Sequence, residues 1–551
     1  MKHSNPPFAK KACQLAGAIA FGSVMLLSAT SAQAFGIDTG NPDLKVRWDN
    51  TLTYNIGWRA QSRDDNLGDN WISQATNHGW DRGDVVTNRV DLLSEFDVIF
   101  QDSHGFRISA AAWNDFAYDK KVEANPVYAE LGLGTAYPNN RFTGKVERWY
   151  KRSGEILDAF VFTEVDVLDI PVNIRAGRHN LYWGESLFSF NSIAYAQGPL
   201  DLRKGTAMPG VEAKELFLPQ TQISAVAQVN DKLSVAAFYM LEWDPHRLPE
   251  GGTYLGGADL SFLGGTNFLG FPYVGDIDHG RRGKPSDTGS WGVSASFPSE
   301  LLDGTVGLFY RKFDDRFPTQ LNTPDFMYNA YAEDVKLYGI SLSKLVGAIS
   351  VGAELSLREN TGLATIGTLD ELARGDTIHA LVNMVAYFGT NSLWNAASLS
   401  AELTYDRLHS ISSADKGRIN HESYNNCSVS DGCVTDDAWG IQLAFEPTWY
   451  HVYPGVDMTM PINFGMGLKG NSATPLGTAE DSGAWSVGIG LDIHSKYEVD
   501  LAYNGYFGDY SKGVNNVVPD DPRVNPVWVT QNGNGILGDR GWVSLTGKMS
   551  F

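Results

Sequence analysis

One segment of about 36 residues, from Trp183 to Leu218, carries charged side chains of both signs. The charged candidates in this segment are Glu185, Asp201, Arg203, Lys204, Glu212, Lys214 and Glu215. On a loop that folds into a pore, such charges would set a transverse field and select the solutes that pass. On a loop that stays at the cell surface, the same charges would be solvated. The sequence leaves both interpretations open.

Two further candidates, Arg175 and His179, precede this segment on the polar side of an alternating stretch. The opposite side of the stretch carries Val172, Ile174 and Ala176, which is the pattern of a strand with one apolar face. If the strand belongs to a barrel, Arg175 and His179 face the lumen just below the charged loop. His179 could line the passage, or it could simply hydrogen-bond a side chain of the neighbouring strand.

Catalytic chemistry finds little support in the residue pattern. A hydrolase needs a nucleophile beside a histidine with an orienting acid or amide, and neither G-x-S-x-G nor H-E-x-x-H occurs. The loop from Gln531 to Asp539 lacks the first aspartate and the bidentate glutamate of a calcium loop. We therefore expect a protein that is not an enzyme and that has no cofactor and no metal site, although loop carboxylates could bridge to lipopolysaccharide through divalent cations.

The carboxyl-terminal stretch from Gly541 to Phe551 indicates which elements position these residues. Val543, Leu545, Met549 and Phe551 share one face, and mostly polar residues take the other. A transmembrane barrel must pair its last strand with its first, because lipid cannot satisfy an open sheet edge. Alternation that runs to a terminal phenylalanine also resembles the signal read by the barrel-assembly machinery.

Alternating segments recur along the whole chain and predict an all-β, antiparallel transmembrane β-barrel of about eighteen strands. The predicted strands lie near residues 44–58, 85–100, 105–118, 156–168, 171–182, 219–229, 232–243, 288–298, 302–314, 333–345, 348–359, 376–389, 393–409, 436–449, 453–468, 482–493, 496–508 and 541–551. Short and long connections alternate without exception, as periplasmic turns and external loops do in outer-membrane barrels. Pro447 and Pro461 interrupt two strands, and the count would fall to sixteen if these strands do not form.

The amino terminus predicts export from the cytoplasm. Residues 1–34 combine three lysines, an apolar stretch from Leu15 to Leu27 and an A-x-A pattern, which together predict a signal peptide cleaved after Ala34. An uncleaved membrane anchor is the alternative. Residues 35–551 then form the barrel as one domain.

Composition supports the same class of protein and argues against nucleic acid as a partner. Loss of the leader removes three lysines and no acid, so 40 basic residues face 64 acidic ones and the mature net charge is about −24. Glycine is abundant, aromatics make up 12% and charged residues only 19% of the chain, with a mean hydropathy of −0.22. A barrel has this profile because half of its strand residues face a wet lumen.

Cysteines are rare in the predicted mature chain. Cys13 lies in the leader, and Cys427 and Cys433 lie six residues apart in a polar stretch. In an oxidising compartment, a disulfide that closes one loop is the expected arrangement. Two free thiols or a metal pair are the alternatives, but no histidine or cysteine flanks them at ligand spacing.

Three motifs carry a resemblance to a known family. They are G-R-x-x-x-x-W-G-E-S at Gly177 to Ser186, P-G-x-E-x-K-E-x-x-L-P at Pro209 to Pro219, and F-Y-x-x-E-W at Phe238 to Trp243. The chain resembles a family of Gram-negative outer-membrane proteins known as a domain of unknown function. It departs from the family's I-N-P-x-D loop, where it has Ala196 to Asp201, and this departure leaves the role of that loop open.

The resemblance implies an outer-membrane barrel of a Gram-negative bacterium, embedded among outer-membrane lipid and lipopolysaccharide. Such proteins are often encoded beside a periplasmic lipid-carrier-like protein and an inner-membrane exporter of the resistance-nodulation (RND) type. The resemblance therefore implies passage or export of a hydrophobic or amphiphilic solute. A general diffusion porin for hydrophilic solutes, or a surface adhesion or lipid-binding barrel without transport, are the alternatives.

Overall fold

The computed structural model describes most of the predicted mature chain. It describes residues 35–551 except 69, 71, 124, 208–212, 261–264, 266, 269–270, 273–275, 279–282, 323–325, 367–370 and 515–526. The leader at residues 1–34 lies outside the described residues, so cleavage after Ala34 stays a prediction.

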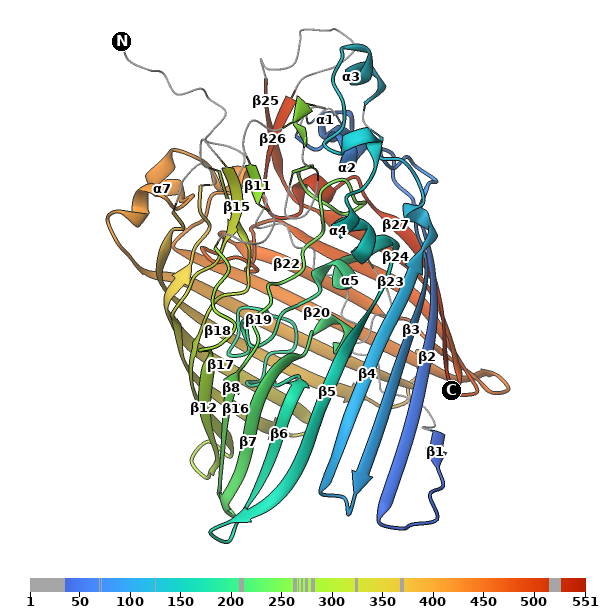
Figure 1. Cartoon of the computed structure of the whole chain (residues 1–551), viewed down its shortest axis with the longest axis vertical. Helices are drawn as coiled ribbons and strands as arrows, with labels where there is room; N and C mark the ends of the chain where they lie inside the picture. Colours follow the sequence, from blue (N-terminus) through green and yellow to red (C-terminus); the bar gives the residue numbers. More distant parts are fainter. Residues whose placement is uncertain are drawn as a thin grey trace.

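One antiparallel sheet closes on itself to form the barrel (Figure 1). The sheet has 20 strands, but β1 is a short addition and β21 and β22 continue one another, which leaves 18 spanning positions. In order they are β2 (Leu44–Arg59), β3 (Val85–Phe100), β4 (His104–Asp115), β5 (Arg152–Val167), β6 (Ile170–His179), β7 (Gln220–Asn230), β8 (Leu233–Met240), β12 (Trp291–Ser299), β13 (Gly304–Phe313), β16 (Val335–Val346), β17 (Ile349–Gly362), β18 (Arg374–Phe388), β19 (Ala396–Ile411), β20 (Asp437–Tyr453), β21 (Val456–Thr459) with β22 (Ile462–Lys469), β23 (Gly483–Ile493), β24 (Tyr497–Phe507) and β27 (Trp542–Ser550). The predicted barrel of about eighteen strands is confirmed.

The first and last spanning strands pair directly and close the barrel. β2 and β27 pair antiparallel from Thr51 with Ser550 to Arg59 with Trp542. Trp48, Leu52 and Tyr54 are exposed on the outer face of β2, whereas Asn55 on the inner face is buried. The same division holds on β27, where Leu545 is exposed and Ser544 and Thr546 of the inner face are buried. The barrel therefore has an apolar exterior and a polar interior, as a transmembrane barrel requires.

Below the end of β27, the lower half of β2 has a different neighbour. The short strand β1 (Phe35–Ile37) pairs with residues 46–48 of β2 and occupies the edge that β27 does not reach. This addition at the amino end of the described chain was not predicted, because three residues carry too little periodicity to be recognised.

The alternation of connection lengths is confirmed. Eight short turns lie at the lower end of the barrel in Figure 1, and the long loops gather at the upper end. By the general rule for these barrels, the lower end faces the periplasm and the upper end faces outside.

Two prolines shape neighbouring strands in different ways. Pro461 separates β21 from β22, and both segments pair with β23, so one strand position is kept with a break in it. Pro447 lies inside β20, which continues past the turn predicted at residues 450–452 as far as Tyr453. The register shifts between Trp449 and Tyr453, and this irregularity absorbs the extra residues before the turn.

The long loops contain short helices and strands. The helices are α1 (Asp65–Gly68), α2 (Gln74–His78), α3 (Pro126–Glu130), α4 (Gly144–Val146), α5 (Leu202–Ala207), α6 (Ala213–Leu216) and α7 (Glu422–Asn425). The loop strands are β9 (Asn267–Phe268), β10 (Phe271–Pro272), β11 (Asp276–Asp278), β14 (Thr319–Asn322), β15 (Phe326–Ala330), β25 (Tyr510–Val514) and β26 (Val527–Gln531). Short 3₁₀ helices are η3 (Phe116–Tyr118), η4 (Pro138–Asn140), η6 (Asp415–Gly417), η7 (Val429–Asp431) and η8 (Gly535–Leu537), and η5 (Glu147–Lys151) is a short π-helix. None of the described helices has the length and apolarity needed to cross a membrane.

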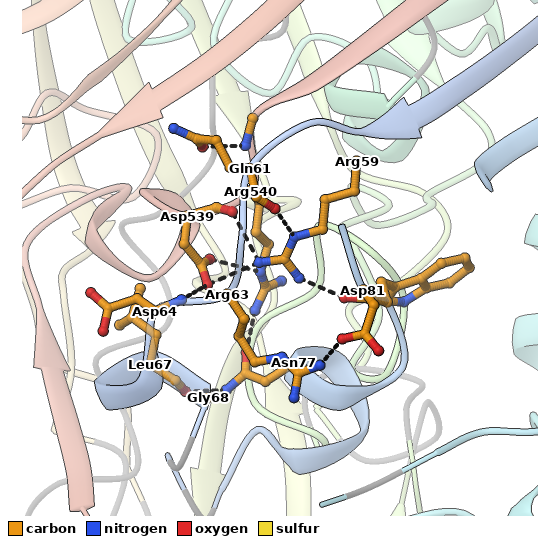
Figure 2. A network of polar contacts seen from close by, with 12 residues as sticks. Arg59, Gln61, Arg63, Asp64, Leu67, Gly68, Asn77, Asp81, Asp539 and Arg540 are labelled. Atoms are coloured by element: carbon orange, nitrogen blue, oxygen red, sulfur yellow. Dashed lines mark hydrogen bonds and ion pairs between the residues drawn. The ribbon is translucent and has the colours of Figure 1, made fainter. Parts of the chain in front are cut away.

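External loops from both ends of the chain pack together above the seam between β2 and β27. Their buried apolar residues form one cluster, which includes Trp80, Tyr137, Tyr254 and Trp542. At its edge, the buried guanidinium of Arg59 donates to Asp539 Oδ2 at 2.9 Å and to Trp80 O at 2.6 Å (Figure 2). These bonds join the end of the first spanning strand to the loop that leads into the last, so they lock the seam at its outer end.

A second external loop is closed covalently. Cys427 and Cys433 form a disulfide with Cα atoms 6.1 Å apart. The loop packs against a small apolar cluster that includes Leu363, Ile419 and Val434.

Candidate functional site: the inner loop

The connection between β6 and β7 leaves the wall of the barrel and folds into its interior. We call residues 180–219 the inner loop. Figure 1 shows its helix α5 inside the barrel, at the height of the spanning strands. At its start, His179 Nε2 lies 2.8 Å from Ser224 Oγ on β7, and Gln222 Nε2 donates to His179 O at 2.8 Å. His179 therefore joins β6 to its neighbouring strand at the point where the chain turns inward.

Two glutamates of the opposite wall bind the backbone of the inner loop. Glu354, on β17, accepts hydrogen bonds from the amides of Glu185, Ser186 at 2.9 Å and Ile193 at 2.8 Å. Both oxygens of this carboxylate are used, and the residue is 6% exposed. A carboxylate that accepts amide hydrogens forms bonds about twice as strong as those between neutral groups.

Glu402, on β19, binds the next turn of the same segment. Its carboxylate accepts from the amides of Leu187 at 2.7 Å and Ser189 at 2.6 Å, and more weakly from Phe188 at 3.3 Å. Between these two glutamates, Asn383 Nδ2 donates to the carbonyl of Glu185 at 2.6 Å. Residues 185–193 are therefore held on the inner wall mainly by their backbone, and the Asn191 side chain adds a bond to Asp406 at 3.0 Å.

Arginines of the wall bind the carbonyls that follow. Arg311 Nη1 donates to the carbonyls of Ile193 and Tyr195, both at 2.7 Å, and Arg316 Nε donates to Ala196 O at 3.1 Å. Arg358 Nη2 donates to Asn191 Oδ1 at 2.8 Å. Because amide hydrogens meet carboxylates and carbonyls meet guanidinium groups, the wall complements the loop backbone in charge along its length.

The returning half of the inner loop carries a buried ion-pair cluster. Asp201 lies 2.7 Å from Arg203 and 3.3 Å from Arg247, and Arg247 in turn lies 2.8 Å from Glu155 on β5. Burial disfavours the charged carboxylate, but the two guanidinium groups outweigh it and hold the pKa of Asp201 well below its ordinary value. Lys204 pairs with Glu215 at 3.4 Å. Asp201 thus stays ionised throughout the physiological range, and its ion pairs fix the loop against β5.

The structure brings four of the predicted charged candidates together and separates the others. Asp201, Arg203, Lys204 and Glu215 form two ion pairs on the inner loop. Glu185 contributes its backbone amide and carbonyl to the wall contact, and its carboxylate lies 3.4 Å from Ser341 Oγ.

The remaining candidates have different positions. Arg175 is exposed to the lumen below the loop, with its guanidinium 5.7 Å from the ring of Phe160. Glu212 and the side chain of Lys214 lie outside the described residues. The family motif around Pro209 is therefore described only in its second half.

The surfaces that remain accessible inside the barrel differ in character. Leu187 and Phe188 of the inner loop stay partly exposed. On the β3–β5 wall, Arg107 lies among three acids, 2.7 Å from Glu95, 3.5 Å from Asp97 and 3.8 Å from Asp158. The interior therefore offers apolar side chains on the loop and charges of both signs on the wall, where acids outnumber the arginine.

The residues that fix the inner loop were not identified from the sequence. Glu354 and Arg358 lie on the same face of one strand, and polar residues on the inner face are expected in any barrel with a water-filled lumen. A weak signal was available, because a glutamate and an arginine that share an inner face with serines and glycines stand out by size. Among the described residues, no group of three or more histidines, cysteines, aspartates or glutamates could hold a metal ion.

One family of proteins matches almost the whole chain. The profile of a family described as "Protein of unknown function (DUF1302)" matches residues 15–551. Among curated proteins, no sequence matches the chain.

Solved structures with a similar fold are outer-membrane proteins of low sequence identity. OpdK of Pseudomonas aeruginosa, solved with vanillate, is 10% identical over 92% of this chain and 98% of that chain, with a TM-score of 0.38. OccAB4 of Acinetobacter baumannii is 8% identical over 92% and 98%, with a TM-score of 0.41. OccK2 of Pseudomonas aeruginosa, in complex with glucuronate, is 10% identical over 92% and 98%, with a TM-score of 0.38. These likenesses concern the fold alone.

Proposed function

We propose that this chain, which belongs to the DUF1302 family, passes a hydrophobic or amphiphilic solute across the outer membrane of a Gram-negative bacterium. The observation that carries the proposal is the inner loop, which crosses the lumen and is bound to its wall by Glu354 and Glu402. Its partly exposed Leu187 and Phe188 give a passing solute an apolar contact that the charged strand wall does not provide. The proposed role is transport without catalysis.

A wide diffusion pore fits this interior less well. The inner loop packs into a buried apolar cluster with wall residues that include Phe238, Phe313 and Leu337. A general diffusion porin keeps a water-filled channel, whereas here a packed core occupies part of the lumen. Such an interior supports a selective or gated route over free diffusion.

The proposed partners follow from the family resemblance. A periplasmic lipid carrier would deliver or receive the solute at the end with short turns, and an RND-type exporter of the inner membrane would drive the traffic. Lipopolysaccharide would surround the outer half of the barrel, and the assembly machinery would insert it through its terminal strand.

A second candidate is a selective porin for charged hydrophilic solutes. The observation that favours it is the ion cluster of Arg107 with Glu95, Asp97 and Asp158 on the lumen wall. Charges of both signs along a wet wall bind and release charged solutes.

Reconstitution of the full mature chain into lipid vesicles distinguishes these functions. We expect a fluorescent lysophospholipid to enter albumin-loaded vesicles faster when they contain the barrel than when they lack it. We also expect a small ion conductance. A large steady conductance without lysophospholipid transfer would favour the porin. Neither activity, combined with unchanged solute traffic in a deletion strain, would favour adhesion or lipid binding.

A further inference from the structure

The barrel wall contains a step between β5 and β6 at its outer end. The first paired residues of these two strands are Ala159 and Arg178, and β6 ends one residue later at His179. The six residues of β5 from Arg152 to Leu157 therefore extend beyond the end of β6. This upper part of β5 pairs with β4 on one side. Among the described residues, no backbone hydrogen bond joins residues 153–157 to a segment on the other side.

The step exceeds the stagger that strand tilt produces. Tilted strands in a closed barrel shift steadily relative to their neighbours. Within the described part of this end of the barrel, the next largest overhangs are four residues, at β3 over β4 and at β19 over β20. The overhang of β5 arises because β6 and β7 end early, where the chain turns inward to form the inner loop.

The step lies at the level of the outer leaflet. Ile223 and Tyr239, on the outer faces of β7 and β8, are exposed apolar residues near the ends of these strands. At the same level, Arg178 and Glu242 form an ion pair at 2.7 Å, which marks the polar boundary. Ile156, on the outer face of the free part of β5, is 58% exposed. Lipid therefore reaches the lower edge of the step, and head groups lie beside it.

Directly inside the step lies an apolar cluster that belongs to wall and loop together. It contains Leu93, Trp113, Leu157 and Leu218, with Trp149 packed against it. Leu218 ends the inner loop, so the cluster connects the loop with the inner face of the free strand.

An ion pair closes the step beside this cluster. Glu155, from the free part of β5, binds Arg247 of the loop after β8, and Arg247 also binds Asp201 of the inner loop. The guanidinium of Arg247 stacks on Trp149, 4.1 Å from the ring. Side-chain contacts thus take the place of the missing backbone ladder.

We propose that this step is a lateral passage between the lumen and the outer leaflet for a lipid-like amphiphile. The apolar part of the amphiphile crosses the Leu157–Leu218 cluster. Its polar head group meanwhile replaces the contact between Glu155 and Arg247. The free edge of β5 permits this movement because, within the described part of the chain, no strand-to-strand hydrogen bonds hold this edge. The inference rests on the proposed function and adds the direction in which the amphiphile leaves the barrel.

Cross-linking across the step tests the lateral passage. In Glu155→Cys/Arg247→Cys, a short bifunctional thiol reagent joins the free strand to the loop; apart from the leader, the only native cysteines are already paired. The matched control is Ala110→Cys/Ile156→Cys, which joins positions already paired between β4 and β5. Each variant is compared with itself before and after the reagent, so that effects on folding cancel.

The measurement is transfer of a fluorescent lysophospholipid, with ion conductance recorded in parallel. We expect cross-linking across the step to slow transfer at least tenfold and to leave conductance unchanged, whereas the control cross-link changes neither. If the cross-linked variant still transfers the lysophospholipid at the wild-type rate, the lateral passage is overturned and the proposed function stands. Wild-type transfer no faster than in empty vesicles overturns both.

Discussion

The carboxylates of Glu354 and Glu402 should decide whether the inner loop stays on the wall. The perturbation is the double variant Glu354→Gln/Glu402→Gln, which keeps the shape of both side chains and removes their charge. Each carboxylate accepts three backbone amides of the inner loop. A glutamine amide replaces one accepting oxygen with an NH2 group, which cannot accept a hydrogen bond from an amide.

The magnitude follows from the bonds lost. Hydrogen bonds to charged groups contribute about 1.5–3 kcal/mol each, and buried donors left unsatisfied add to the cost. If half of the six contacts are lost and the loop partly relaxes, the double variant should weaken attachment by about 3–6 kcal/mol. Since about 1.4 kcal/mol is a tenfold change in an equilibrium constant, the detached population should rise by roughly a hundredfold to ten-thousandfold.

Single-channel recording in planar bilayers measures this detachment. We expect the double variant to show frequent, large openings that the wild type shows rarely, with each single variant between the two. Glu446→Gln, on β20, is the matched control, because no hydrogen bond or ion pair joins this glutamate to the described residues of the inner loop. Equal conductance of wild type and double variant, with both folded, would refute the role assigned to the two glutamates.

Three further predictions concern stability. Arg59→Ala removes a buried cation that joins the barrel seam. We expect the free energy of unfolding to fall by about 2–4 kcal/mol, measured as a lower unfolding temperature on semi-native gels. Lys45→Ala, in an exposed pair, should change the unfolding temperature little. Burial raises the pKa of Asp259 to about 7, so its folded form binds a proton more tightly than its unfolded form. Stability of the external loops should therefore fall as pH rises from about 4 to about 7, by a few kcal/mol, and Asp259→Asn should flatten this dependence in hydrogen exchange. Replacing Cys427 and Cys433 with serine should cost about 2 kcal/mol and increase hydrogen exchange in their loop alone.

Each of these has a contrary outcome. An unfolding temperature for Arg59→Ala equal to that of Lys45→Ala would show that the Arg59 contacts do not stabilise the seam. External loops more protected from exchange at pH 8 than at pH 5 would reverse the sign assigned to Asp259. Unchanged exchange after serine replacement would show that packing alone orders the loop of Cys427 and Cys433.

The barrel could be predicted from the sequence because its signals are local. A strand with one lipid face and one wet face alternates every two residues, and a tight turn must fit within a few residues. The ends of strands differ from the prediction where a proline or a register shift interrupts the alternation. Pro461 splits its strand, whereas Pro447 is accommodated inside a strand that continues to Tyr453.

The inner loop could not be placed from the sequence because its partners lie far along the chain. Whether residues 185–193 fold inward depends on Glu354 and Glu402, and the spacing of these residues is that of any lumen-facing residue. The prediction weighed the side chain of Glu185, but the backbone amide of this residue makes the contact. Recognition of a backbone by a distant side chain has no signature in local residue spacing.

The position of the inner loop on the β17 wall is tested most directly by a cysteine pair. A Cβ atom added to Gly352 would lie 2.9 Å from Glu185 Cβ and 2.6 Å from Asn383 Oδ1. Glu185→Cys/Gly352→Cys therefore reaches disulfide geometry once the loop and the Asn383 side chain shift. We predict that this pair oxidises spontaneously in the periplasm, whereas Glu185→Cys/Gly465→Cys, with its second cysteine on β22, keeps free thiols. Free thiols in both variants, reacting equally fast with an external reagent, would contradict an inner loop that rests on this wall.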